Sequence, residues 1–257
     1  MQRSAGNHFQ SLLAQSPLAS GLIPFAFPGV PGVQCVFSTA LAGNMSLEAS
    51  NGPDDLALTV QRRTSLMHQC GFARWAEVYQ VHGDAIVENN GLETAELAPT
   101  AKADGHFTHT PGVALVIKTA DCQPLLITRS DGKAVAALHV GWRGNALNLP
   151  GSGIARFCAE FACSPKDLFV VRGPSLGPGA AEFINFASEW PRDFLPWFNP
   201  ESRTMNLWAL TRHQLESAGV PPANIFSLDL CTHTHHSTFF SHRRRHAGRQ
   251  TSLVWRV

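Results

Sequence analysis

The sequence predicts a single α/β domain, although its length of 257 residues alone also fits a large all-β domain. Strand-like and helix-like segments both recur along the chain, and no repeat, linker or change of composition divides it. We expect residues 1–20 to form a loosely ordered arm and 21–257 to form the domain. Such a chain can bury roughly three quarters of its unfolded surface, so it can fold without disulfides or a structural metal.

The N-terminal part is predicted to hold extended segments followed by one helix. Residues 22–31 are apolar but contain three prolines, which lack the amide needed in a sheet, so we expect an edge strand or an extended segment. Residues 35–39 are predicted to form a strand. A helix is expected to begin at Pro53 and to end near Cys70, where Gly71 would terminate it.

The middle of the chain is rich in predicted strands. Their expected positions are 75–81, 113–117, 125–128 and 134–140. The second is a continuous apolar, β-branched run, which is typical of a strand buried on both faces. The Ser-Asp-Gly segment at 130–132 predicts a hairpin between the last two strands. Residues 88–103 are rich in Ala and Glu without a clear period and are expected to form a long loop.

The C-terminal part is predicted to mix helices and short strands. The helices are expected at 148–162, where Asn148 would be the cap, at 182–199 and at 208–217, which Gly219 would close. The strands are expected at 169–172, 225–230 and 253–255.

Composition argues against several classes of protein. With 44% hydrophobic and 15% charged residues, the chain is expected to be globular. A net charge of +1 provides no field that would attract nucleic acid or an anionic membrane. No signal segment or apolar run of ~20 residues is visible, and the six cysteines are scattered without a CxxC pair. We therefore expect a cytoplasmic protein with reduced thiols, as a monomer or homodimer.

Three residues are candidates for a transition-metal site. His82 is placed at a predicted strand end, Cys122 at a strand-to-turn junction, and His139 at the end of an apolar strand. Imidazole and thiolate are natural ligands of zinc and copper, and three protein ligands leave one position open for water or substrate. Zinc at such a site would lower the pKa of a bound water towards 7. The spacings of 40 and 17 residues match no short metal motif, so each residue taken alone fits an ordinary packing role better than a ligand role.

The segments around these residues resemble the YfiH-like family, also called the laccase-domain or DUF152 family and long described as polyphenol oxidases. The matching segments are YQVHGD (79–84), ADGHFT (103–108), KTADCQPLLI (118–127), AALHVGWRGNAL (136–147), GPSLGP (173–178), LCTH (230–233), FFSHRRR (239–245) and GRQTSLVW (248–255). The resemblance extends from about Phe37 to the C-terminus. The combination of TADC and HVGWRG is highly specific.

The resemblance implies a single domain of layered, mixed β-sheets covered by helices. It also implies that His82, Cys122 and His139 bind zinc and form the catalytic centre. Relatives of this kind look like purine nucleoside phosphorylases that act on adenosine, inosine, guanosine and methylthioadenosine and that deaminate adenosine. A copper-dependent polyphenol oxidase ranks second, because three such ligands cannot build a multicopper cluster. A metal-free Cys/His hydrolase of peptidoglycan precursors and a non-catalytic binding module are further alternatives.

Five further residues are candidates for binding substrate or phosphate. Arginine suits phosphate because its planar fork is bidentate and permanently charged. Arg143, Arg62 and Arg243 are the candidates of this kind, although Arg143 would equally well pack on Trp142 or pair with an acid. Asp104 and Asp121 are candidates for acid/base catalysis, or alternatively for a turn or for orienting a histidine ligand.

The chain departs from the family pattern at several positions. Ala40 stands where the family usually has an arginine, which removes one candidate ligand for phosphate. A histidine cluster near the C-terminus offers a second metal site or a polar loop; its members are His233, His235, His236, His242 and His246. The turn 173–175 would cradle an anion or be an ordinary turn. The aromatic stretch 183–198 would stack a purine, pack in a core or form a dimer surface.

Overall fold

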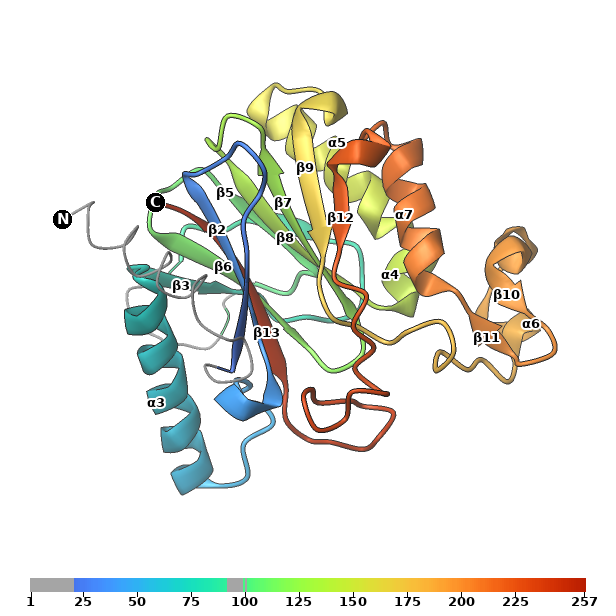
Figure 1. The fold of residues 1–257 in the computed structure, drawn as a ribbon, viewed down its shortest axis with the longest axis horizontal. Coiled ribbons are helices and arrows are strands. Elements are labelled where there is room, and N and C mark those ends of the chain that lie inside the picture. Colours follow the sequence, from blue (N-terminus) through green and yellow to red (C-terminus); the bar gives the residue numbers. More distant parts are fainter. Residues whose placement is uncertain (1–20, 92–98, 100) are drawn as a thin grey trace.

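The computed structural model describes residues 21–91, 99 and 101–257. The arm expected at 1–20 and much of the loop expected at 88–103 lie outside these residues. The described chain forms one α/β domain in which two mixed β-sheets pack face to face and helices cover both outer faces (Figure 1). The predicted fold class is therefore confirmed. No helix in the described part of the chain combines the length and the apolar character required to cross a membrane.

The first sheet has five strands in the order β1-β2-β13-β6-β3. The strands are β1 (Leu22–Phe25), β2 (Val33–Ser38), β3 (Arg74–Glu77), β6 (Val113–Thr119) and β13 (Gln250–Arg256). Only β3 and β6 run parallel; the other neighbours are antiparallel. Pro24 lies in β1, at the edge of the sheet, as its missing amide requires.

The second sheet has six strands in the order β12-β9-β7-β8-β5-β4. The strands are β4 (Ile86–Glu88), β5 (Gly105–Thr108), β7 (Gln123–Arg129), β8 (Val135–Val140), β9 (Leu168–Arg172) and β12 (Ile225–Ser227). The hairpin predicted at 130–132 joins β7 to β8, with Gly132 at a φ of 69°. Both sheets contribute to the central core, in which Phe37 and Leu115 of the first meet Leu126 and Val171 of the second.

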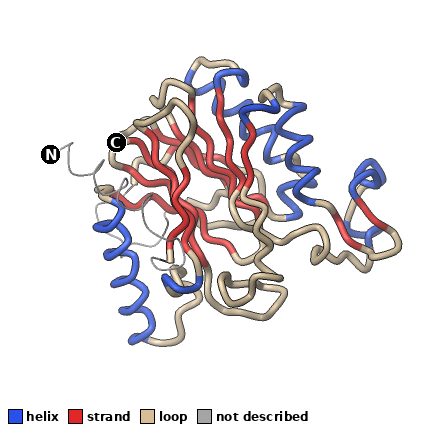
Figure 2. Tube along the Cα trace, viewed as in Figure 1, coloured by secondary structure: helices blue, strands red, loops and turns tan. Residues whose placement is uncertain are grey.

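Helices close the two outer faces (Figure 2). Helix α3 (Pro53–Cys70) packs Leu66 and Cys70 against the five-stranded sheet and ends at Gly71 in the left-handed conformation, as predicted. Helices α5 (Leu149–Phe161) and α7 (Leu207–Ser217) cover the six-stranded sheet through Ile154, Phe157 and Leu215. The layers therefore follow the order helix, sheet, sheet, helix.

A buried group of charges links α3 to the five-stranded sheet. The Glu77 carboxylate accepts from the guanidinium of Arg63 at 3.0 Å, from the ammonium group of Lys118 at 2.6 Å and from the indole of Trp75 at 2.8 Å. Arg63 also donates to the carbonyl of Met45. Each buried charge thus has an oppositely charged partner, which offsets the cost of removing it from water.

Several predicted boundaries are wrong. The strand expected at 75–81 ends at Glu77, and the strand expected at 225–230 ends at Ser227. Strands β4 and β5 and the short helix α4 (Trp142–Ala146), which follows β8, were not predicted.

The long helix expected at 182–199 is also wrong. Residues on either side of Pro191 form α6 (Phe186–Glu189) and a 3-10 helix at Arg192–Trp197. A small hairpin follows, made by β10 (Phe198–Asn199) and β11 (Thr204–Met205). Together these segments form a lobe beside α7 (Figure 1).

Candidate metal centre

The structure brings the three predicted ligands together at one end of the six-stranded sheet. His139 is the last residue but one of β8, and Cys122 directly precedes β7, whose Pro124 pairs with His139. His82 lies in the segment between β3 and β4. One ligand atom from each residue lies within 4.8 Å of the other two, and the two imidazole rings are 4.8 Å apart between centroids. Residues that are 57 positions apart in the chain (82 to 139) therefore form one cluster.

Asp104 positions both histidines. Its wholly buried carboxylate lies 2.8 Å from Nδ1 of His139, so Nε2 of that ring is left for the cluster. The same carboxylate accepts three successive backbone amides, from Val81, His82 and Gly83, at 2.7–3.2 Å. These bonds hold His82 at a φ of 60°, a left-handed conformation that is uncommon outside glycine. Asp104 thus lies where a residue orienting a histidine ligand is expected.

Cys122 and His139 form a charged pair in the absence of a metal. Burial opposes ionisation of Cys122, but the positive charge of His139 and hydrogen bonds from both histidines lower the pKa of the thiol to about 6. Burial likewise opposes protonation of His139, but the Cys122 thiolate and the Asp104 carboxylate raise the pKa of the imidazole to about 9. The cluster therefore holds a thiolate at neutral pH, which is the form that binds metals.

Gly141 has no side chain, and this leaves room beside the ligand atoms of His82 and Cys122. A Cβ at this position would lie 2.9 Å from Nδ1 of His82 and 3.2 Å from Sγ of Cys122. Sequence reasoning missed this role, although the signal was a glycine placed two residues after His139. Two imidazoles and one thiolate around a gap of this kind fit a zinc or copper ion. His82 is exposed, so the cluster opens to solvent on that side.

Asp121 organises the loops around the cluster, and within the described residues its carboxylate hydrogen bonds go to partners other than histidine. Its carboxylate accepts from the hydroxyl groups of Thr232 and Ser241 and from the backbone amide of Arg243, at 2.7–3.1 Å. Its own φ is 94°, another left-handed position outside glycine. Because Asp121 directly precedes Cys122, these bonds hold the C-terminal segment next to that proposed ligand.

The three candidate arginines are placed differently. The guanidinium of Arg143 stacks on Trp142 at 4.4 Å, and that of Arg243 lies 5.7 Å from the ring of Phe183. The rings of Trp142 and Phe183 are themselves in contact, at 6.0 Å between centroids, so each arginine lies against one ring of the same aromatic pair. Arg62 lies on α3, with its side chain against Gly43.

Two further expectations, for the turn 173–175 and for the aromatic stretch 183–198, can be compared with the described residues. The turn 173–175 does not cradle an anion, because the amides of Gly173 and Ser175 donate to the carbonyls of Pro124 and Leu230. The aromatic stretch 183–198 mainly forms the core of the lobe, where Phe183 and Trp190 are buried.

The histidine cluster forms no second metal site in the part of the chain that the structure describes. There, the only group of three His, Cys, Asp or Glu side chains close enough to share an ion is His82, Cys122 and His139. His235 instead contacts the carbonyl of Cys231, and His246 accepts from the amide of Ser241.

The fold and the cluster together define a single-domain α/β protein with a candidate metal centre. Residues 35–257 match the model of the family described as multi-copper polyphenol oxidoreductase laccase. The chain belongs to this family, which confirms the resemblance to YfiH-like proteins.

Relatives of known name cover nearly the whole chain. Purine nucleoside phosphorylase YfiH of Escherichia coli is 29% identical over 93% of this chain and 100% of its own. Purine nucleoside phosphorylase of Xylella fastidiosa strain 9a5c is 31% identical over 95% of this chain and 96% of its own. The crystal structure of YlmD from Geobacillus stearothermophilus superimposes with a TM-score of 0.77 at 27% identity, covering 89% of this chain and 93% of that one.

Proposed function

We propose that the protein is a zinc-dependent purine nucleoside phosphorylase with adenosine deaminase activity, and that His82, Cys122 and His139 form its metal and catalytic centre. The substrates would be adenosine, inosine, guanosine and methylthioadenosine. The observation that carries the proposal is the cluster itself, in which two imidazoles and one thiolate place their ligand atoms within 4.8 Å of one another, with an open side at His82. The relatives named purine nucleoside phosphorylases support the choice of reaction.

The chain's own residues provide the other requirements of phosphorolysis. Zinc, when bound, would supply a Lewis acid and lower the pKa of water. Asp104 would keep His139 in one orientation, and Arg143 and Arg243, each against one ring of the Trp142–Phe183 pair, would bind phosphate in line with the sugar carbon. The site would then transfer the sugar from the purine to phosphate.

Product analysis tests this proposal. Zinc-loaded protein, given adenosine and phosphate, is expected to release adenine and ribose 1-phosphate, and to release inosine when phosphate is omitted. Cys122→Ser should abolish both reactions, whereas Cys158→Ser, a substitution at the end of α5, should leave them unchanged. The proposal fails if zinc-loaded protein forms neither product. Oxygen uptake with a phenol, lost in Cys122→Ser, would instead identify a copper-dependent polyphenol oxidase.

One observation favours a second candidate function. The thiol of Cys122 contacts the imidazole of His139, which in turn contacts the carboxylate of Asp104. This is the sequence of nucleophile, base and orienting acid that metal-free cysteine hydrolases use. In this alternative the thiolate would attack an amide of a peptidoglycan precursor, and His139 would protonate the leaving amine. Chelated, metal-free protein distinguishes the two, since it should hydrolyse such an amide fully under this alternative and be inactive under the first.

A further inference from the structure

Two cysteines meet at the C-terminal end of α5, remote in the chain from the three clustered residues. Cys158 lies in the last turn of the helix, and Cys163 follows two residues after its end. Ala162, between them, has a left-handed φ of 47°, and its amide and that of Cys163 both donate to the carbonyl of Cys158, the latter at 3.1 Å. Helix ends of this type commonly bring the corresponding two side chains into contact.

The local backbone suits a disulfide bond. Disulfides need α-carbons ~4.4–6.8 Å apart, and the 3.1 Å hydrogen bond between the two residues' backbones holds them near that range. Both side chains are partly buried and pack against the same core cluster. Both are free thiols in the structure.

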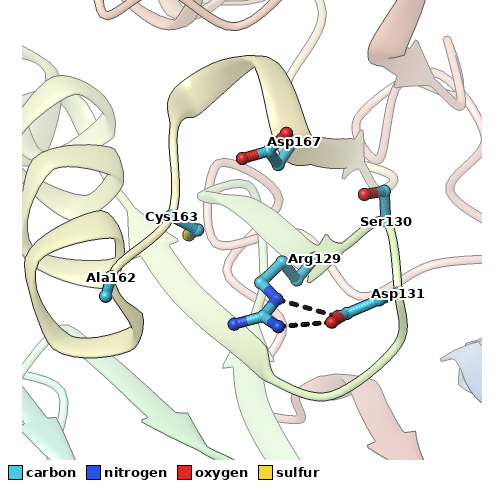
Figure 3. Close-up of a pocket in the computed structure, with 6 residues that line it drawn as sticks. All are labelled: Arg129, Ser130, Asp131, Ala162, Cys163 and Asp167. Atoms are coloured by element: carbon cyan, nitrogen blue, oxygen red, sulfur yellow. Dashed lines mark hydrogen bonds and ion pairs between the residues drawn. The ribbon is translucent and has the colours of Figure 1, made fainter.

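Cys163 also lines a cavity of about 290 Å³ on the surface (Figure 3). The guanidinium of Arg129 lies in the same cavity, fixed by an ion pair with Asp131 and by a 3.1 Å bond to the carbonyl of Phe161. Arg129 lowers the pKa of Cys163, whereas Asp131 and Asp167, which line the same cavity, raise it.

We propose that Cys163 and Cys158 form a thiol–disulfide couple that reacts with low-molecular-weight disulfides of the glutathione type. The Cys163 thiolate attacks one sulfur of the disulfide RSSR, forms a mixed disulfide and expels RS⁻. Cys158 then loses its proton, attacks the sulfur of Cys163 and expels the second RS⁻. The protein loses two protons and two electrons, and RSSR gains them and is reduced to two RSH.

The surroundings set the conditions of this reaction. Burial raises the pKa of Cys163, with Arg129 and Cys158 acting in the opposite direction, and burial together with Cys163 raises the pKa of Cys158 to about 12. Asp131 and Asp167 are the acidic groups that face the pair. Both thiols are therefore mostly protonated at neutral pH, and the exchange should accelerate as the pH rises.

One tryptic peptide reports the result. Cleavage after Arg156 and Lys166 releases residues 157–166, FCAEFACSPK, which contain both cysteines and no other. After the zinc-loaded full chain is incubated with oxidised glutathione at about pH 8.5, this peptide should lose two hydrogens. Cleavage after Glu160 should then leave two fragments joined until a reductant is added. The wholly buried Cys35 and Cys70 provide internal controls that should remain unmodified.

The variants separate the two steps. Cys158→Ser should retain one glutathione on Cys163, and Cys163→Ser should prevent both the mixed disulfide and the closed form. The proposal is overturned if the wild-type peptide keeps two free thiols under conditions in which oxidised glutathione modifies a model peptide with exposed cysteines. It is equally overturned if wild-type Cys163 keeps glutathione without closing on Cys158. The wild-type result stands even if a variant fails to fold.

Discussion

The carboxylate of Asp104 lies 2.8 Å from Nδ1 of His139 while it also binds the backbone amide of His82 at 2.9 Å. One buried acid therefore fixes the ring of one proposed ligand and the backbone of another. This arrangement makes the geometry of the cluster depend on a residue that need not touch the metal.

Asp104→Asn should weaken zinc binding by about 10- to 100-fold, the usual effect of removing a group that orients a histidine ligand. The dissociation constant, measured by competition with a chromogenic chelator, checks this. Asp131→Asn, at a partly exposed aspartate remote from the cluster, is the matched control and should bind zinc normally. Equal affinities in the two variants would show that Asp104 does not position the ligands.

Zinc affinity should depend on pH in two stages. Between about pH 6 and 9 the thiol of Cys122 is already ionised, but His139 must lose a proton, so affinity should rise about tenfold per pH unit from this pair. Below about pH 6, Cys122 is protonated too, and affinity should fall more steeply as the pH drops. Affinities measured from pH 5 to 9 check this, and a constant affinity across that range would contradict it.

Gly141→Ala should reduce zinc affinity by at least about tenfold, or about 1.4 kcal/mol, because the added methyl group would lie 2.9 Å from Nδ1 of His82. Gly179→Ala is the matched control, since a Cβ there meets nothing within 4 Å. Calorimetric titration of both variants with zinc provides the measurement. Unchanged binding in Gly141→Ala would mean that the ligand atoms do not converge on this gap.

Glu77→Ala should lower the free energy of unfolding by about 3–5 kcal/mol, because it leaves Arg63 and Lys118 buried without this carboxylate. Glu160→Ala, which removes a surface ion pair with Arg156, should cost less than about 1 kcal/mol. Urea denaturation of the two variants gives the comparison. Similar losses in both would refute the structural role assigned to Glu77.

Local patterns in the sequence predicted the α/β class and the position of α3 well, whereas the layering of the sheets was implied by the family resemblance. The left-handed glycine at 71 and the apolar runs of β6 and β8 act within a few residues, so they are visible without the fold. Strand β5 was hidden because it begins with Gly105, a residue type of low strand propensity, and it is stabilised by pairing with β4 and β8.

Long-range contacts account for most of what was missed in the site. The left-handed conformation of His82 depends on Asp104, 22 residues later, so the sequence around His82 suggested a strand end instead. The helix expected at 182–199 failed for a local reason, because Pro191 and Pro196 interrupt it and its aromatic residues pack as a lobe.

Elemental analysis of the protein purified without added metal tests the central proposal most directly. We expect close to one zinc per chain in the wild type, and its loss in His82→Ala, Cys122→Ala and His139→Ala, while Cys163→Ser keeps it. Wild-type protein that remains folded but binds no zinc even when the ion is supplied, or any of these three single variants that retains it, would contradict the account.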